Sequence, residues 1–186
     1  MKTEIEQALV TLKRGGLILY PTDTLWGIGC DATNAASVER VFQLKERAES
    51  MALICLVNDF KMLNKFIEKV PEITCELLKN PDKPTTIIYD GPIGVAQNLI
   101  ADDNSLAIRV VQDDFCKKLI RKFGRPIVST SANVSGEKAP QSFQEINHKI
   151  LEGVDYVVNL HRNKKATKPS VIFKLKNDGT VTVIRN

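Results

Sequence analysis

The sequence predicts an α/β fold in which helices flank a twisted, mostly open mixed β-sheet. Short apolar runs, which are typical of buried strands, alternate along the 186 residues with segments of helical periodicity. The final pair of predicted strands forms a hairpin, which adds antiparallel pairing to the sheet. The chain shows no repeat, low-complexity tract or linker, so we expect a single domain spanning residues 1–186.

The first half of the chain begins with a helix and a buried strand. Thr3 and Glu6 form a capping box for the first helix, which Gly15-Gly16 ends. Asn34 is a typical N-cap for a second helix. The other elements predicted here are a strand at 17–20 stopped by Pro21, a loop or irregular strand at 22–29, a strand at 53–57 and helices at 60–68 and 71–79.

The second half continues the alternation. Phe115, Leu119 and Phe123 lie on one face of a helix that ends at Gly124. Ser142 and Glu145 form a second capping box, which predicts a helix through Leu151. The remaining predictions are strands at 85–89, 106–111, 126–130 and 154–160, a polar loop at 131–140, and a hairpin of 170–175 and 180–184 around Asn177-Asp178-Gly179.

Composition excludes several classes of protein. No apolar run reaches the ~18 residues that a membrane span needs, and residues 1–14 do not read as a signal peptide. The four cysteines form no C-x-x-C pair and there are only two histidines, which argues against a zinc site and a Ser-His-Asp hydrolase. We therefore expect reduced cysteines and a cytoplasmic protein. A net charge of +4 permits contact with phosphates without requiring it.

The segment 27–32 matches G-x-G-x-x-A, the loose form of a dinucleotide-binding fingerprint. That fingerprint must open a helix directly after a strand, whereas Pro21 ends the strand here and the next helix starts near Ala35. The chain also lacks the G-x-x-x-x-G-K-[ST] phosphate loop. Neither nucleotide-binding motif is therefore predicted.

Three polar segments have both a structural and a functional interpretation. Thr22 and Thr24 would point to one side of an extended segment, or would satisfy the backbone of their own loop. Lys45 and Arg47 would converge on an anion if the chain turns extended there, or would simply be favourable charges at a helix C-terminus. Ser129-Thr130-Ser131-Ala132-Asn133 leaves the end of a strand, and its alternate side chains would bind a ligand or build a turn.

Two basic segments remain. The cations between Lys117 and Arg125 lie on or beside a helix whose other face is apolar, so a solvated face is expected. Those between Arg162 and Lys168 lie in a predicted loop, where they would contact phosphate or RNA or belong to a mobile lid.

Taken in order, six segments resemble the YrdC-type family of threonylcarbamoyl-AMP synthases, over essentially the whole chain. They are Tyr-Pro-Thr-Asp-Thr-Leu-Trp-Gly-Ile-Gly at 20–29, Lys-x-Arg at 45–47, Ala-Ile-Arg-Val at 107–110, Ser-Thr-Ser-Ala-Asn-Val-Ser-Gly at 129–136, Pro-Ser-Val at 169–171 and Ile-Arg at 184–185.

The resemblance implies an activity and a fold. Members of the family convert L-threonine, bicarbonate and ATP, with Mg²⁺, into threonylcarbamoyl-AMP and pyrophosphate. A separate transferase complex then uses the product to form N6-threonylcarbamoyladenosine at position 37 of tRNA. The family fold is a twisted sheet around a deep basic cavity, and this chain resembles the short form without a C-terminal extension.

The resemblance also implies roles for particular residues. Lys45 and Arg47 would be the catalytic residues that hold the ATP phosphates. The further ATP contacts would be Ser105, Ser131, Asn133 and Arg185. Arg109 would pair with the threonine carboxylate, a ligand that would compensate a charge placed in mid-strand. The threonine pocket would be completed by Thr24, Ser129 and Ser170. No protein ligand for the metal is implied.

The chain departs from the family pattern after Lys-x-Arg, where Ala48 and Ala52 replace prolines and Met51 replaces a polar residue. Two alternatives to the synthase therefore remain. One is a double-stranded RNA-binding or ribosome-maturation module without the chemistry. The other is a relative that binds nucleotide only. Binding to RNA would fall steeply with salt, whereas adenylate formation requires Arg109 and the serine-rich segment.

Overall fold

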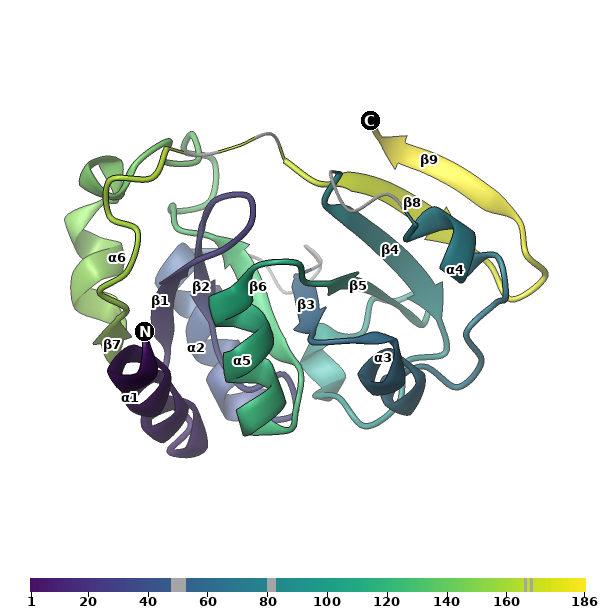
Figure 1. The fold of residues 1–186 in the computed structure, drawn as a ribbon, viewed down its shortest axis with the longest axis horizontal. Helices are drawn as coiled ribbons and strands as arrows, with labels where there is room; N and C mark the ends of the chain where they lie inside the picture. Colours follow the sequence, from purple (N-terminus) through teal and green to yellow (C-terminus); the bar gives the residue numbers. More distant parts are fainter. Residues whose placement is uncertain (48–52, 80–82, 166, 168) are drawn as a thin grey trace.

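The computed structural model describes residues 1–47, 53–79, 83–165, 167 and 169–186, which contain a nine-stranded sheet (Figure 1). The strand order is β7-β1-β2-β6-β3-β5-β4-β8-β9. The strands are β1 (Ile18–Pro21), β2 (Trp26–Gly29), β3 (Ile54–Val57), β4 (Thr85–Asp90), β5 (Ser105–Val110), β6 (Ile127–Ser131), β7 (Tyr156–Val157), β8 (Val171–Leu175) and β9 (Val181–Arg185). The helices are α1 (Lys2–Lys13), α2 (Ala35–Lys45), α3 (Phe60–Phe66), α4 (Thr74–Leu77), α5 (Asp114–Phe123) and α6 (His148–Gly153), with 3-10 turns η1 (Gln97–Leu99) and η2 (Phe143–Glu145).

The sheet is mixed, as predicted. β3 runs parallel to β5, β4 to β8, and β1 to β7. The pairs β1–β2, β2–β6, β3–β6, β4–β5 and β8–β9 are antiparallel. The expected C-terminal hairpin is therefore confirmed, and Gly179 supplies the positive φ of its turn.

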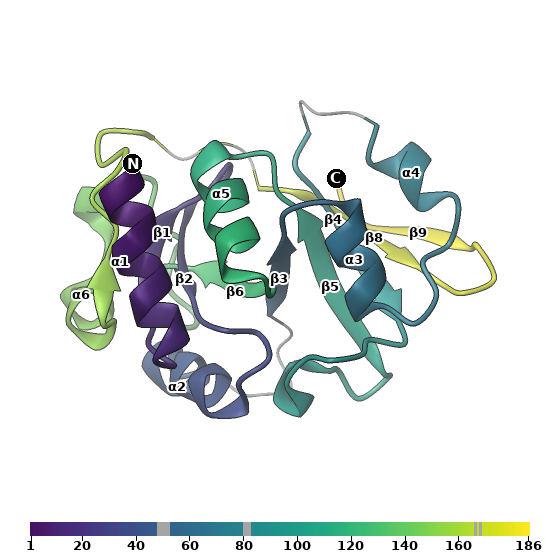
Figure 2. The ribbon, with the colours of Figure 1, turned by 60° about the horizontal axis from the view of Figure 1, so that its bottom comes forward.

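Helices flank the sheet in two sets. α1 and α5 lie side by side (Figures 1 and 2) and share an apolar cluster with Ile18, Tyr20 and Leu56. α2 contributes Val38 and Val41 to a separate cluster that also holds residues of the strands, among them Ile28 and Cys55. α5 is amphipathic because apolar residues recur every three or four positions, and its positive charges are left toward solvent.

Local signals placed several element ends correctly. The Asn34 side chain accepts a hydrogen bond from the backbone N–H of Ser37, which caps α2 as expected. Gly124 ends α5 in the left-handed conformation.

Several of the predicted boundaries differ in the structure, and the helices predicted at 60–68 and 71–79 are reduced to the shorter α3 and α4. Met1 rather than Thr3 precedes α1, and no side-chain cap forms there. Pro21 belongs to β1 rather than ending it. Proline has no N–H to donate, and none is needed on the side of β7, which pairs with Ile18 and Leu19. Glu145 does bond Ser142, but the pair opens only the turn η2, and Asn147 caps α6. The strand predicted at 154–160 is reduced to β7.

In the described part of the chain, every helix is too short or too polar to cross a bilayer.

Candidate active site

A cavity of about 430 Å³ lies over the centre of the sheet and is lined by residues from Thr22 to Arg185. Its described lining contains several hydroxyl groups and three arginines, Arg47, Arg109 and Arg185, but no carboxylate. Such a surface suits an anionic ligand. Seven of the ten predicted site residues line it: Thr24, Arg47, Arg109, Ser129, Ser131, Ser170 and Arg185.

The turn between β1 and β2 presents two threonine hydroxyls to the cavity, 3.2 Å apart. The Thr22 hydroxyl accepts hydrogen bonds from the backbone N–H groups of Thr24 (3.1 Å) and Leu25 (3.2 Å). The interpretation as a loop that satisfies its own backbone is therefore confirmed, and a ligand-binding role for Thr24 stays a prediction. Thr22 organises its own loop, and Thr24 is thereby held at the cavity wall.

Arg109 projects from β5 and is only 4% exposed. Its Nη1 donates to the Thr24 hydroxyl (3.3 Å), and its Nη2 lies 3.1 Å from a carboxylate oxygen of Asp23. Its Nε–H has no hydrogen-bond partner among the described residues. The protein itself therefore supplies a counter-ion for this charge, Asp23, and the expected pairing of Arg109 with a ligand carboxylate stays a prediction. The buried Nε–H therefore remains an unused donor.

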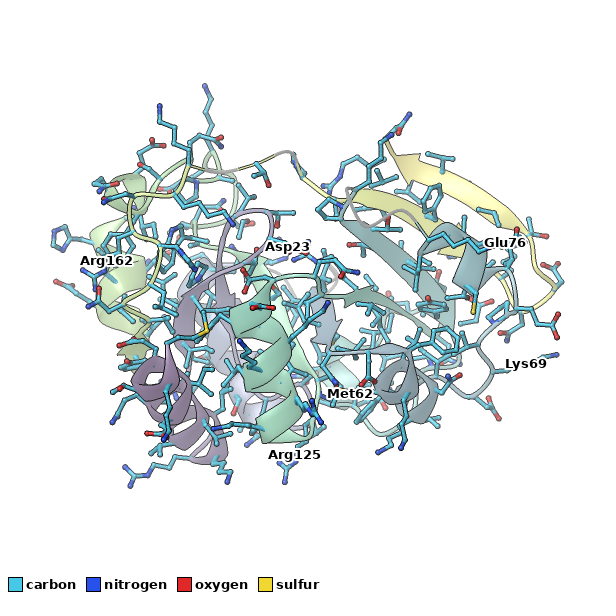
Figure 3. All side chains as sticks on the ribbon, in the orientation of Figure 1. Asp23, Met62, Lys69, Glu76, Arg125 and Arg162 are labelled. Carbon is cyan, nitrogen blue, oxygen red and sulfur yellow. The ribbon has the colours of Figure 1, made fainter. Side chains whose placement is uncertain are left out.

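Asp23 has an unusual environment. Its side chain is 11% exposed, and neither carboxylate oxygen has a hydrogen-bond partner among the described residues besides the ion pair with Arg109. Figure 3 shows it on the loop that joins β1 to β2. A buried carboxylate depends on its counter-ion, so Asp23 and Arg109 form one electrostatic unit.

Another part of the wall is formed by Ser170, just before β8, and by Arg185 at the end of β9. The Ser170 hydroxyl lies 2.8 Å from that of Thr86. Arg185 donates from Nε (3.0 Å) and Nη2 (2.8 Å) to the carbonyl oxygen of Ser170. Arg185 is thus held at the cavity by a forked hydrogen bond.

Ser129 and Ser131 both line the cavity, as alternation predicts, although Thr130 between them lines it as well. The same prediction for Asn133 is wrong, because β6 ends at Ser131 and the alternation ends with it. The Asn133 amide instead donates to the carbonyl oxygens of Val134 and Glu137, both at 2.9 Å. Asn133 thereby shapes the loop that follows the strand.

Lys45 does not belong to the cavity lining. It is 1% exposed, and its ammonium group donates to the carbonyl oxygens of Ser131 (2.5 Å) and Asn133 (2.6 Å). The backbone N–H of Ser135 donates back to the Lys45 carbonyl (2.7 Å). Burial, and then the neighbouring charge of Arg47, lower the pKa of Lys45 to about 8.

Arg47 does line the cavity. α2 ends at Lys45, and Glu46 adopts the left-handed conformation (φ 50°), which turns the chain between the two cations. Lys45 therefore points to the 131–135 loop while Arg47 reaches the cavity. Partial burial lowers the pKa of Arg47, but a guanidinium remains protonated.

Ser105 lies at the start of β5, on the same face as Ala107 and Arg109, but beyond the end of the cavity. Its hydroxyl donates to Asp103 at 2.5 Å. The predicted roles of Ser105, Lys45 and Asn133 as ATP contacts stay predictions. Ala48, Met51 and Ala52 lie outside the described residues.

Two described residues of the basic segment after β7, Arg162 and Thr167, contact the surroundings of the cavity. Arg162 lies over the ring of Phe143 (4.4 Å), and that ring lies 4.9 Å from Trp26, which lines the cavity (Figure 3 labels Arg162). Thr167 is attached to the threonine turn, since its N–H (2.9 Å) and hydroxyl (3.3 Å) both donate to the Thr24 carbonyl. The loop is therefore tied to the cavity wall rather than independent of it.

We expect Lys45→Met to loosen the 131–135 loop and lower the free energy of unfolding by about 1–3 kcal/mol, because two buried carbonyl groups lose a charged donor. The effect should grow with pH. The pKa of Lys45 is near 8 when folded against 10.5 as the reference value, so between these values the unfolded chain binds more protons and the wild type gains stability as pH rises. Lys45→Met lacks that gain. Thermal unfolding of both proteins from neutral to alkaline pH measures the difference, and a constant difference would contradict the assignment.

Comparison with known proteins identifies the family. Residues 10–186 match the model of the Sua5/YciO/YrdC family, described as "telomere recombination". This chain belongs to that family. It is 30% identical to the threonylcarbamoyl-AMP synthase of Pseudoalteromonas translucida over 95% of each chain. It is 31% identical to the synthase of Stenotrophomonas maltophilia, over 83% of this chain and 85% of that one.

Solved structures of Sua5/YciO/YrdC proteins share the fold. E. coli YciO superposes with a TM-score of 0.85 at 24% identity, covering 100% of this chain and 90% of its own. P. abyssi Sua5 complexed with L-threonine superposes with a TM-score of 0.79 at 24% identity, covering 92% of this chain and 50% of that longer one. The predicted twisted mixed sheet with flanking helices is thereby confirmed.

Sequence reasoning overlooked Asp23 and Thr86 in this Sua5/YciO/YrdC site. Asp23 belongs to the Pro-Thr-Asp-Thr segment already identified from the sequence. Its ion pair could not be predicted, because its partner Arg109 lies 86 positions further along the chain. Thr86 could have been found only from the pairing of the two strands, because it lies directly beside Arg109 on the neighbouring strand.

Proposed function

We propose that this chain forms threonylcarbamoyl-AMP. The reaction consumes L-threonine, bicarbonate and ATP and releases pyrophosphate and water. The observation that supports it is the cavity itself, which presents three arginines and a set of hydroxyls with no carboxylate among its described lining. The names of the relatives that match nearly the whole chain agree with it.

In this proposal Arg109 binds the threonine carboxylate through its free Nε edge, and Thr24, Ser129 and Ser170 surround the rest of the amino acid. Bicarbonate condenses with the threonine amine to give a carbamate and water. A carbamate oxygen then attacks the α-phosphorus of ATP, the bond to the β-phosphate oxygen breaks, and pyrophosphate leaves. The protein orients the reactants and supplies positive charge, which are the main requirements for catalysis of a reaction at a phosphate group.

Arg47 and Arg185 are the cations we assign to the ATP phosphates, with Ser131 beside them. A magnesium ion would enter with ATP as part of that substrate. The described residues contain no cluster of three or more His, Cys, Asp or Glu, so phosphate oxygens and water would supply its ligands.

We also propose that residues 1–186 act as one catalytic domain in the cytoplasm, where ATP and the final acceptor tRNA are found. Both ends of the chain contribute, since Thr22 and Arg185 line the same cavity. The product would be consumed by a separate transferase that modifies tRNA. Direct contact with RNA is not required for the synthesis itself.

Pyrophosphate release from ATP tests the proposal. We expect release that requires both L-threonine and bicarbonate, with a product of the mass of threonylcarbamoyl-AMP. Omission of either co-substrate is the control. Binding of ATP without pyrophosphate release would instead support a nucleotide-binding relative, and RNA binding without either would support the RNA-binding module.

A further inference from the structure

A second hollow, of about 740 Å³, lies between α3 and α5 and shares no lining residue with the cavity. We call it the α3–α5 groove, and its main side chains are Lys61, Lys65, Lys117, Lys118, Arg121 and Met62. The parallel neighbours β3 and β5 lead into it, because Asn58 follows β3 directly and α5 follows β5 after three residues. Figure 3 labels Met62, which marks its position.

Positive charge is concentrated in the α3–α5 groove. Among the described residues, five cations and two carboxylates line it, a net of three positive charges, against +4 for the whole chain. The two carboxylates already have partners. Asp59 caps α3 by accepting the N–H of Met62 (2.7 Å), and Asp114 pairs with Lys118 (3.4 Å). Lys61, Lys65 and Arg121 form no ion pair with a described residue.

The cations come from two rows, one on each of the two helices that line the groove. Lys61 and Lys65 are four residues apart on α3, and Lys117 and Arg121 are four residues apart on α5. Like charges at this spacing lie on one side of a helix and destabilise it. A bound chain of negative charges would relieve the repulsion in both rows at once.

We propose that the α3–α5 groove binds the phosphate backbone of RNA. A protein partner is less suited, because the centre of such an interface is rich in aromatic residues and poor in lysine, whereas the large apolar side chain in this lining is Met62. The described residues of the lining include no aromatic ring on which a base could stack, so the contact reads the backbone rather than the sequence. The choice of RNA over DNA rests on the proposed function, whose product is used on tRNA.

The test compares two double variants of the full chain. Lys65→Glu with Arg121→Glu reverses one charge on each side of the groove. Lys69→Glu with Lys176→Glu reverses two exposed lysines elsewhere, and Lys69 lies well away from Met62 in Figure 3. Binding of an unmodified tRNA transcript is measured by fluorescence anisotropy over a series of salt concentrations.

We expect the groove variant to bind tRNA at least about tenfold more weakly than the wild type, with a log–log salt slope reduced by about 0.7–0.9 for each lost phosphate contact. The control variant should keep most of the wild-type slope. Equal losses in both variants, no loss in the groove variant, or equally tight binding of polyglutamate would each overturn the proposal. Displacement of tRNA by inorganic phosphate at constant ionic strength would do the same, since it would indicate a small-anion site.

Synthesis of threonylcarbamoyl-AMP, measured without RNA, separates this proposal from the proposed function. Both double variants should retain wild-type synthesis, because none of the four residues lines the cavity. If the wild type makes no product, the proposed function fails while the tRNA comparison still decides the groove. Loss of synthesis in the groove variant alone would show that the groove is not separate from the active site.

Discussion

Arg109→Lys is expected to raise KM for threonine by about 10- to 100-fold and to leave KM for ATP nearly unchanged. Lysine keeps the positive charge beside Asp23 but loses the planar fork, and with it the free Nε–H that we assign to the threonine carboxylate. A loss of that size corresponds to about 1.4–2.7 kcal/mol, which is the range of one charge-assisted hydrogen bond. Steady-state pyrophosphate release with each substrate varied in turn measures both constants.

The lysine variant is preferred to alanine because of Asp23. Arg109→Ala would leave a buried carboxylate without its cation, which costs about 3–5 kcal/mol of folding stability. A kinetic defect in that variant would then be mixed with unfolding. Thermal unfolding of Arg109→Ala tests this directly, and we expect it to be clearly less stable than Arg109→Lys.

Arg125→Lys is the matched control. Arg125 also pairs with a buried aspartate, Asp31 (2.7 Å), but lies outside the cavity lining, and Figure 3 labels it well away from Asp23. It should leave KM for threonine unchanged. An unchanged KM for threonine in Arg109→Lys would remove Arg109 from the threonine site.

How much of this site could be read from the sequence depended on how local the determining contact is. Asn34 caps α2 and Gly124 ends α5 through bonds within a few residues, so both were predicted. Ser129 and Ser131 followed from the two-residue period of one strand. The same period places Ser105 and Arg109 on one face, yet only Arg109 reaches the cavity, because the position of a cavity's end is set by elements remote in sequence.

Lys45 shows the opposite case. The direction of the Lys45 side chain depends on the left-handed backbone of Glu46, which the sequence does not signal because the residue is not a glycine. It also depends on carbonyl groups 86 and 88 residues away. No pattern in the Lys-Glu-Arg segment reveals these partners. The ion pair of Asp23 with Arg109 is equally remote in sequence. A sequence motif therefore identifies the residue types of a site, but it does not give the side-chain orientations that such non-local contacts determine.

Arg47→Ala is expected to lower kcat/KM for ATP by about 10²–10³-fold, because a preorganised cation facing the developing negative charge is worth that much in comparable sites. Arg47 lines the cavity while its neighbour Lys45 is committed to the 131–135 loop, so in this structure the Lys-x-Arg segment offers the cavity one charge rather than two. Arg47→Lys should recover part of the loss.

The nucleotide comparison decides what Arg47 touches. If it neutralises the phosphates that leave as pyrophosphate, Arg47→Ala should weaken the binding of ATP far more than that of AMP, measured by calorimetry. Equal weakening of both would place Arg47 at the adenosine or the α-phosphate instead. Because we assign Arg109 to threonine and Arg47 to ATP, their effects on kcat/KM should be nearly additive in the double variant with Arg109→Lys. Strong non-additivity would mean that the two arginines act on the same ligand group, and the division of the cavity into a threonine end and a phosphate end would be wrong.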